Sequence, residues 1–415
     1  MADAIQTTYL SSIWQNLERY LTSHPKYHKV FCEAIDQLFY GCGPMILSDR
    51  HFIALMASSR HQCNSLMQLH KREFERLGGN INWLKGLQYV PLKIRNLDML
   101  SAILAHQPWS IDVDHLSALT KCAPPANWSL SELLQAVIIL AQTHVLCSFI
   151  LGSYNDERPK FDKGTVANAQ NNYDKQKIGE VESLLKRMNE LKEIQLMVHN
   201  ENISEQQRQK HFLEVHSEQI SNDKISQGSS PSNVTISQHF YSLFTDNMNF
   251  CYVDFAKRAR DGFAKTHKIH DISWEDHGYS CMDELYNEMA DILDKKFRLT
   301  RSLTYFTMGG YSHVDTTKYR TAIWMYIQSL YGIRHDDYNY SEVNIMLSGE
   351  MKTFIKIISC FPEKTTASLR DSVMSEFKLS EKVHVILLIM EARFQAELIH
   401  FFRALIKLNS SSDNR

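Results

Sequence analysis

Apolar residues recur along this chain at intervals of three and four positions, the spacing that places side chains on one face of an α-helix. The pattern is clear over residues 7–23 and again over 26–40. Strict alternation of apolar and polar residues, which is typical of a half-buried β-strand, is absent from the sequence. The pattern therefore predicts an all-α protein.

Capping signals indicate where several of these helices begin and end. Ser48 can cap a long helix that runs toward Leu77, where Gly78 stops it. Ser129, followed three residues later by Glu132, forms a capping box in front of a nearly all-apolar helix. A helix that is apolar on all sides must be covered by its neighbours, so we expect this helix at the centre of a core.

Three further helices are predicted in the rest of the chain. Asp315 or Thr316 can cap a helix that reaches about Tyr331. A long apolar helix over 381–408 is expected to be buried. Apolar residues at helical spacing among many charges predict a solvent-facing or domain-bridging helix over 181–197.

Two polar segments, 153–176 and 221–233, contain few apolar residues and have the composition of linkers. A chain of 415 residues also exceeds the size of a typical single core, so two domains are expected. The predicted division is a helical domain over 1–152, a polar and partly helical linker over 153–235, a second helical domain over 236–409 and a disordered tail over 410–415.

Composition excludes several classes of function. The hydrophobic fraction is 44%, the charged fraction is 22% and the net charge is -2, so nothing favours nucleic acid or an anionic membrane as the main partner. No apolar run is of membrane-spanning length by its sequence pattern, and the first residues lack the zones of a secretion signal. We therefore expect a cytoplasmic or nuclear protein without membrane insertion. Its eight cysteines are scattered without CxxC pairs, which predicts free thiols and no metal site.

Cys63 and His70 form the first candidate site. Seven residues are two helical turns, so both side chains lie on one helix face, and a thiol with an imidazole suggests a peroxidatic nucleophile with a proton partner. The rise between them is roughly 10 Å, too long for a direct hydrogen bond, so a relay would be required. The alternative is that Cys63 is a small buried residue and His70 a hydrogen-bonded core histidine.

The segment 303–340 forms the second candidate site, because it combines hydroxyls, aromatics, paired acids and a lone arginine. On the predicted helix Arg320 points in the same direction as Thr316 and Ile327. A buried cation without a partner costs several kcal/mol, so Arg320 needs either an internal ion pair or a ligand carboxylate. Thr304 and Thr307, like Thr316, could supply neutral hydrogen-bonding groups to such a ligand.

Several short motifs are distinctive. The second half contains SWEDHGY at 273–279, AIWMYI at 322–327, GIRHDDYNY at 332–340, PEKTT at 362–366 and SEKVHVILLIMEARFQAEL at 380–398. The first half contains RHQC at 60–63, WLKGL at 83–87 and LAHQPW at 104–109. Together these motifs resemble the sestrin family at both ends of the chain. The resemblance implies two all-helical halves, each similar in fold to bacterial alkylhydroperoxidases and packed together as a pseudo-symmetric pair.

The resemblance also implies a leucine site. In similar sestrins the residue matching Arg320 holds the leucine carboxylate and the residue matching Glu381 holds its amine. The implied leucine-binding set is Thr304, Thr307, Thr316, Arg320, Glu381 and His384, with Met374 at the lid position. The vertebrate pattern has tryptophan where this chain has Met374, and leucine where it has Tyr319. Methionine can still cover an apolar side chain.

The family pattern assigns roles to the remaining candidates as well. It implies a peroxidatic role for Cys63 with His70, although the relay tyrosine of sestrins is Ser65 here and the second cysteine of alkylhydroperoxidases is Leu66. Asp336 and Asp337 match an acidic pair that contacts the GATOR subcomplex, which activates TOR complex one. From the sequence alone, adjacent acids in a polar loop are more simply a solvated turn.

These considerations favour an intracellular leucine sensor that inhibits the GATOR subcomplex when leucine is absent, and so restrains TOR complex one and takes part in the stress response. No cofactor is expected apart from L-leucine as ligand. The alternative is an alkyl hydroperoxide reductase, an antioxidant enzyme that uses Cys63. A third interpretation is a stress-induced scaffold for kinases such as the AMP-activated protein kinase.

Overall fold

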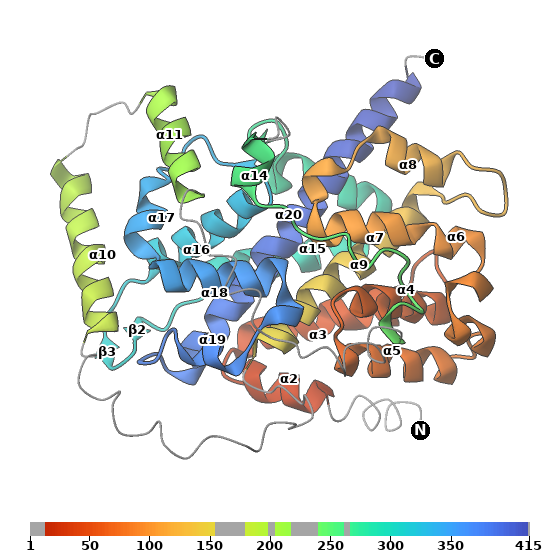
Figure 1. The fold of residues 1–415 in the computed structure, drawn as a ribbon, viewed down its shortest axis with the longest axis horizontal. Coiled ribbons are helices and arrows are strands. Elements are labelled where there is room, and N and C mark those ends of the chain that lie inside the picture. The colour runs from red at the N-terminus through yellow and green to blue at the C-terminus, as the bar shows by residue number, and fades with distance from the viewer. Residues whose placement is uncertain (1–12, 154–178, 198–203, 217–239, 261–265, 414–415) are drawn as a thin grey trace.

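The computed structural model describes residues 13–153, 179–197, 204–216, 240–260 and 266–413, and the chain is almost entirely helical over these residues (Figure 1). In the first half the α-helices are α2 (Ile13–Leu21), α3 (Pro25–Phe39), α4 (Leu47–Arg60), α5 (Asn64–Arg76), α6 (Leu92–Arg95), α7 (Leu97–His106), α8 (Val113–Thr120) and α9 (Leu130–Gly152). Three short 3₁₀ turns accompany them: η1 (Ile81–Lys85), η2 (Leu87–Tyr89) and η3 (Pro108–Ser110).

The remaining helices complete the fold, and they are α10 (Glu180–Met197), α11 (Glu205–Val215), α14 (Phe255–Arg260), α15 (Tyr279–Ser302), α16 (Thr317–Leu330), α17 (Ser341–Met346), α18 (Gly349–Cys360), α19 (Ala367–Asp371) and α20 (Leu379–Asp413). A π turn, η4 (Trp274–Gly278), leads into α15, and a 3₁₀ turn, η5 (Pro362–Lys364), follows α18. The predicted all-α class is confirmed.

Four two-residue strands form the only pairings among the described residues. Strand β1 (His267–Lys268) runs parallel to β4 (Ile333–Arg334), and β2 (Thr307–Met308) forms an antiparallel hairpin with β3 (Tyr311–Ser312). Gly309 turns the hairpin at a φ of 60°, a conformation that glycine adopts at little cost. This hairpin was not predicted, because two-residue strands are too short to show an alternating pattern.

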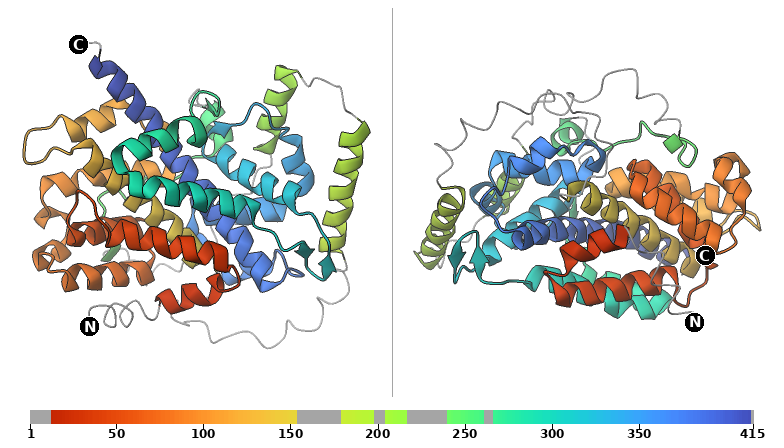
Figure 2. Two further views of the ribbon diagram at one scale, coloured as in Figure 1. Left: turned by 180° about the vertical axis from the view of Figure 1, so that it is seen from behind. Right: turned by 90° about the horizontal axis from the view of Figure 1, so that it is seen from below.

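The long helix α20 runs through the middle of the molecule with α9 packed along it (Figure 2). Helices α15 and α16 also pack on α20, while α4 and α7 pack on α9. Helix α9 is long and apolar enough to cross a membrane, but protein buries 94% of its most apolar 18-residue window. It is therefore the central core helix that its composition predicted.

Charged side chains lie buried between these two helices. Arg393 donates to Glu397 at 2.7 Å, to Ser148 at 2.8 Å and shares a 3.1 Å contact with His61. Lys296 donates to Gln142 at 2.6 Å and lies 3.3 Å from Glu391. Because buried charges are stable only when paired and hydrogen-bonded, these contacts define how α9, α15 and α20 fit together. These side chains come from three helices: Ser148 and Gln142 from α9, Lys296 from α15, and Glu391, Arg393 and Glu397 from α20.

The same order of elements occurs twice in the chain. Helix α7, turn η3, helix α8 and the long α9 are matched by α18, η5, α19 and the long α20. The two long helices also begin alike, since Glu132 accepts from the Ser129 amide at 3.0 Å and Glu381 accepts from the Lys378 amide at 2.9 Å. The buried apolar residues of both halves join in one cluster. The pseudo-symmetric pairing and the domain boundaries stay predictions.

One expected helix is wrong. The predicted helix from Ser48 to Leu77 is two helices, because Gln62 has a φ of 52° and breaks the chain between α4 and α5 while His61 reaches Arg393 in the core. Helix α20 continues to Asp413, and Ser410 donates back to the Ile406 carbonyl at 2.9 Å. The two polar linker segments, 153–176 and 221–233, lie outside the described residues apart from Ser153, while α10 and α11 make the middle of the linker helical.

The buried histidines predict that acid destabilises the fold. Burial lowers the pKa of His51 and His216 to about 3, and that of His335 and His384 to about 4, from 6.5. Between pH 6.5 and 4 the unfolded chain therefore binds more protons than the folded one, so stability falls as pH falls. Three acids oppose this, because burial raises the pKa of Asp49 to about 6, that of Glu363 to about 7 and that of Glu397 to about 8. The histidines outnumber them, since burial also lowers the pKa of six others: His24, His61, His70, His106, His144 and His400.

Urea unfolding at pH 7, 6 and 5 measures this balance. We expect the free energy of unfolding to fall below pH 6.5 by more than about 1.4 kcal/mol per pH unit, the value for one proton. A free energy that is constant from pH 7 to pH 5 would contradict the burial of neutral histidines.

Candidate functional site

A small pocket lies between the β2–β3 hairpin, α16 and the first turns of α20. Six of its residues were predicted from the sequence and six were not. The predicted ones are Thr304, Thr307, Thr316, Arg320, Glu381 and His384. The others are Tyr305, Met308, Tyr319, Phe377, Val385 and Leu388. The structure therefore brings together, in one cavity, side chains that are far apart in the chain.

Arg320 is the only arginine in the lining, and it is 8% exposed. Its Nε donates to the Thr316 hydroxyl at 3.0 Å, its Nη2 donates to the Thr317 hydroxyl at 3.0 Å, and its Nη1 donates to the Arg301 carbonyl. Burial lowers the pKa of Arg320, and the nearby charge of Asp315 opposes that shift. No ion pair of Arg320 is found among the described residues. Two of its five N–H groups are left for a ligand.

Glu381 occupies the first turn of α20 and holds three groups. Its Oε1 accepts from the Thr307 hydroxyl at 2.9 Å, while its Oε2 accepts from the amides of Gly309 and Lys378, both at 2.9 Å. An ionised carboxylate offers about four acceptor sites, so Oε1 retains one. Glu381 therefore closes the hairpin onto α20 and can still accept from a cation.

His384 is held as a neutral ring. Burial lowers its pKa to about 4, and its Nε2 lies 3.1 Å from the Thr300 carbonyl, to which it must donate. The Nδ1 is then an acceptor. Val385 and Leu388 follow at helical spacing from Glu381 and form an apolar wall. This spacing was the signal in the sequence by which both could have been found.

One residue of the pocket lining, Tyr305, contacts the first half of the chain. The Tyr305 hydroxyl lies 2.7 Å from His24 Nδ1 and donates to the Ser23 carbonyl at 3.1 Å. His24 Nε2 in turn lies 2.9 Å from the Ser380 carbonyl at the start of α20. The segment before α3 therefore fixes one wall, a contact that no local sequence pattern could indicate.

The cavity between these side chains is only about 30 Å³. That is room for about two water molecules, since one needs roughly 10 to 15 Å³. Any ligand of amino-acid size must therefore displace part of the wall. The wall segments that lie outside the long helices are the hairpin and the loop 372–378 that carries Phe377.

No contact between Cys63 and His70 is found among the described residues. Cys63 is 1% exposed and caps the start of α5, where its amide donates to the Ser58 carbonyl at 3.0 Å. His70 is buried against Phe39, and its Nδ1 lies 3.1 Å from His51 Nδ1 rather than near the thiol. The geometry agrees with the alternative of a buried thiol and a hydrogen-bonded core histidine.

The two acids after β4 differ in exposure. Asp337 is exposed, as expected for a solvated loop. The Asp336 side chain is only 15% exposed and lies 2.7 Å from Arg334 Nη2, and its backbone carbonyl accepts from Arg208 of α11. The pair therefore combines one structural acid with one that is available to a partner.

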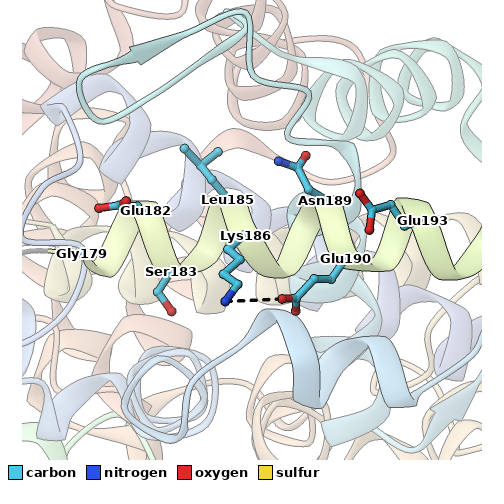
Figure 3. Close-up of a pocket in the computed structure, with 8 residues that line it drawn as sticks. All are labelled: Gly179, Glu182, Ser183, Leu185, Lys186, Asn189, Glu190 and Glu193. Atoms are coloured by element: carbon cyan, nitrogen blue, oxygen red, sulfur yellow. Dashed lines mark ion pairs between the residues drawn. The ribbon is translucent and has the colours of Figure 1, made fainter.

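A larger hollow runs along the outer face of α10 (Figure 3). All its described lining residues come from Gly179 and α10 itself, and Lys186 pairs with Glu190 at 3.9 Å across one turn. A hollow lined by one face of one helix offers no converging groups that could hold a ligand. The smaller pocket beside Glu381 is therefore the better candidate.

Comparison with known proteins identifies the group to which the chain belongs. The family model described as PA26 p53-induced protein (sestrin) matches residues 3–409. Mouse Sestrin-3 is 37% identical over 421 residues, covering 94% of this chain and 85% of the relative. Human Sestrin-2 is 37% identical over 412 residues, covering 94% and 83%, and the Drosophila melanogaster Sestrin homolog is 34% identical over 460 residues, covering 92% and 90%.

The chain belongs to the sestrin family. The structure shows what two departures from the sestrin pattern do. Tyr319 is buried and packs edge-on against Phe377, with ring centroids 6.0 Å apart. Met374 is fully buried at a φ of 54° but is not among the lining residues, so Phe377 of the same loop covers the pocket in its place. Met374 therefore lies outside the pocket lining, and its carbonyl accepts from the Phe377 amide at 3.0 Å.

Thiol labelling of the folded protein tests the account of Cys63. Reactivity requires access, so a maleimide should modify the exposed Cys42 and Cys251 at once and Cys63 only after unfolding. Turnover of cumene hydroperoxide should be slow or absent. Peptide mass spectrometry reads the labelling, and rapid modification of Cys63, or peroxide turnover that Cys63→Ser removes, would support the enzyme instead.

Proposed function

We propose that this sestrin is an intracellular leucine sensor that restrains TOR complex one. Without leucine it binds and inhibits the GATOR subcomplex that activates TOR complex one, and with leucine in the pocket it releases that partner. The observation that carries the proposal is a single pocket that contains a buried arginine and a carboxylate, neither of which has an ionic partner among the described residues.

The charges of the pocket match those of a free amino acid. An amino acid presents a carboxylate and an ammonium group, which require a cation and an anion respectively. Arg320 retains two N–H groups for the carboxylate, and Glu381 retains an acceptor site for the ammonium. A neutral His384 adds no net charge. The pocket therefore favours a zwitterion over an anion or a cation.

The apolar wall favours an aliphatic side chain. Met308, Phe377, Val385 and Leu388 line the pocket beside the charged pair. These side chains can cover a leucine, whereas a polar or charged ligand side chain would lose its hydration without gaining partners. Discrimination against isoleucine and valine rests on fit alone, which is worth only about 1 to 3 kcal/mol for one methylene.

Family membership supports the broader part of the proposal, a stress-linked regulator of TOR signalling. The partner surface is proposed around Asp337, which is exposed, with Asp336 held by Arg334 behind it. We place the protein in the cytoplasm, and also in the nucleus. No observation favours the AMP-activated protein kinase as a second partner.

Removing one charge of the pocket should abolish the response to leucine. Arg320→Ala and Glu381→Gln each leave one ligand charge unpaired, which costs roughly 2 to 5 kcal/mol, or about thirty-fold or more in affinity. The leucine-dependent rise in melting temperature should therefore disappear in both variants. Lys318→Ala, on the same helix but outside the pocket, should keep it. A full leucine shift in Arg320→Ala would refute the assignment of the carboxylate contact.

The acidic pair should be required for partner binding. Asp337→Ala should change stability by less than about 0.5 kcal/mol, because Asp337 is exposed. Asp336→Ala also removes one of the two ion pairs of Arg334 and should cost more. Co-precipitation of the GATOR subcomplex from leucine-starved cells should fail for the double variant and persist for Asp283→Ala, an exposed acid on α15. Unchanged co-precipitation by the double variant would show that the partner binds elsewhere.

A further inference from the structure

Two glutamates connect helix α10 with the loop 372–378, which we call the lid loop. Each glutamate accepts hydrogen bonds from the segment that carries the other. Glu376 of the loop 372–378 accepts from the first amides of the α10 segment: its Oε1 from Gly179 at 3.4 Å and Glu180 at 3.2 Å, and its Oε2 from Val181 at 3.1 Å. These amides have no partner within the helix, and the positive end of the helix dipole attracts the carboxylate. The lid loop therefore caps α10.

Glu180 completes the clamp from the helix side. Its Oε1 accepts from the Met374 amide and its Oε2 from the Ser375 hydroxyl, both at 3.2 Å. Two residues that are 196 positions apart, Glu180 and Glu376, thus bind each other's backbone segment. We call Glu180 and Glu376 the lid clamp. Since Phe377 follows directly and covers the pocket, the lid clamp positions a pocket wall.

The hairpin meets the lid clamp at Gly309. A Cβ at this position would lie 3.0 Å from the Glu376 carbonyl and 3.1 Å from Val181 Cγ2. The Gly309 amide also donates to Glu381 at 2.9 Å. Both the hairpin and the loop 372–378 are therefore in contact with the start of α10.

The rest of α10 leads away from the pocket. Its inner face buries Val181, Leu184 and Met188, and Arg187 donates to the Ile345 carbonyl of α17 at 2.8 Å. Figure 1 shows α10 along the edge of the molecule, with the hairpin at one end and α17 beside it. Helix α10 thus joins the pocket walls to α17.

Helix α11 also packs on α17, and it contacts the loop that carries Asp336. Glu205 at its start lies 2.6 Å from Arg334, the same guanidinium that pairs with Asp336. Arg208 donates to the Asp336 carbonyl. The described contacts therefore form a continuous path from the pocket through α10, α17 and α11 to Asp336.

We propose that α10 is a strap that holds the lid and the hairpin over the bound ligand, and that Glu180 and Glu376 are positioning residues for the pocket. The proposal rests on the proposed leucine site and adds its regulation. Because coupling between two equilibria is reciprocal, a ligand that needs the closed lid must also stabilise the docking of α10. A change in the docking of α10 on ligand binding then reaches the loop of Asp336 and Asp337 through the contacts with α17 and α11.

Two matched variants isolate the lid clamp. Glu180→Gln and Glu182→Gln remove the same charge from the same first turn, but Glu182 lies on the outer face shown in Figure 3 and makes no clamp contact. We expect Glu180→Gln and Glu376→Gln to weaken leucine binding about five- to tenfold, the lower part of the usual coupling range. Glu182→Gln should leave it unchanged. The leucine concentration that releases the GATOR subcomplex should rise by the same factor.

Amide hydrogen exchange with and without leucine tests the strap in the unmodified protein. Leucine should slow exchange in the hairpin 307–312 and also in 180–197, and the second effect should be lost in Glu376→Gln. Protection of the hairpin without protection of 180–197, or equal binding by Glu180→Gln and Glu182→Gln, would overturn the strap while sparing the leucine site. If leucine protects neither segment, the leucine site itself is wrong.

Discussion

One carboxylate, that of Glu381, joins the parts of the pocket. It begins the central helix by accepting from the Lys378 amide, and it closes the hairpin by accepting from Thr307 and Gly309. A first-turn acid that only stabilised the helix would not need the two hairpin contacts. The same carboxylate therefore connects the start of helix α20 with the hairpin that forms one wall of the pocket.

The pocket lies at one end of a core that buried polar contacts hold together. Helices α9 and α20 are locked together by paired buried groups, with Arg393 bound to Glu397 and Ser148, and Lys296 bound to Gln142 and near Glu391. Removing one member of a buried pair costs about 3 to 5 kcal/mol, so these helices have a strongly preferred arrangement. From α20 the pocket uses only the first turns, and the hairpin and the loop 372–378 form its walls outside the long helices.

The sequence predicted those features that local physics decides. The capping box at Ser129 and the start of α16 follow from side chains that bond amides two or three residues away, since Ser129 accepts from the Glu132 amide and Asp315 accepts from the Thr317 amide. The family pattern then supplied Arg320 and Glu381, which the structure places in one pocket. The break at Gln62, the lid role of Phe377 and the clamp of Glu180 with Glu376 were missed. Each depends on contacts between segments far apart in the chain, and such contacts override local propensity and leave no periodic signal.

We propose that Arg320 and Glu381 hold the two charges of leucine in one pocket. Isothermal titration calorimetry of the full chain with L-leucine tests this proposal, with the leucine methyl ester and isocaproate, which lack the carboxylate and the ammonium charge respectively, as comparison ligands. We expect one leucine per chain and a loss of at least about thirty-fold in affinity for each comparison ligand. No heat with leucine at millimolar concentration, or equal binding of leucine and either comparison ligand, would contradict it.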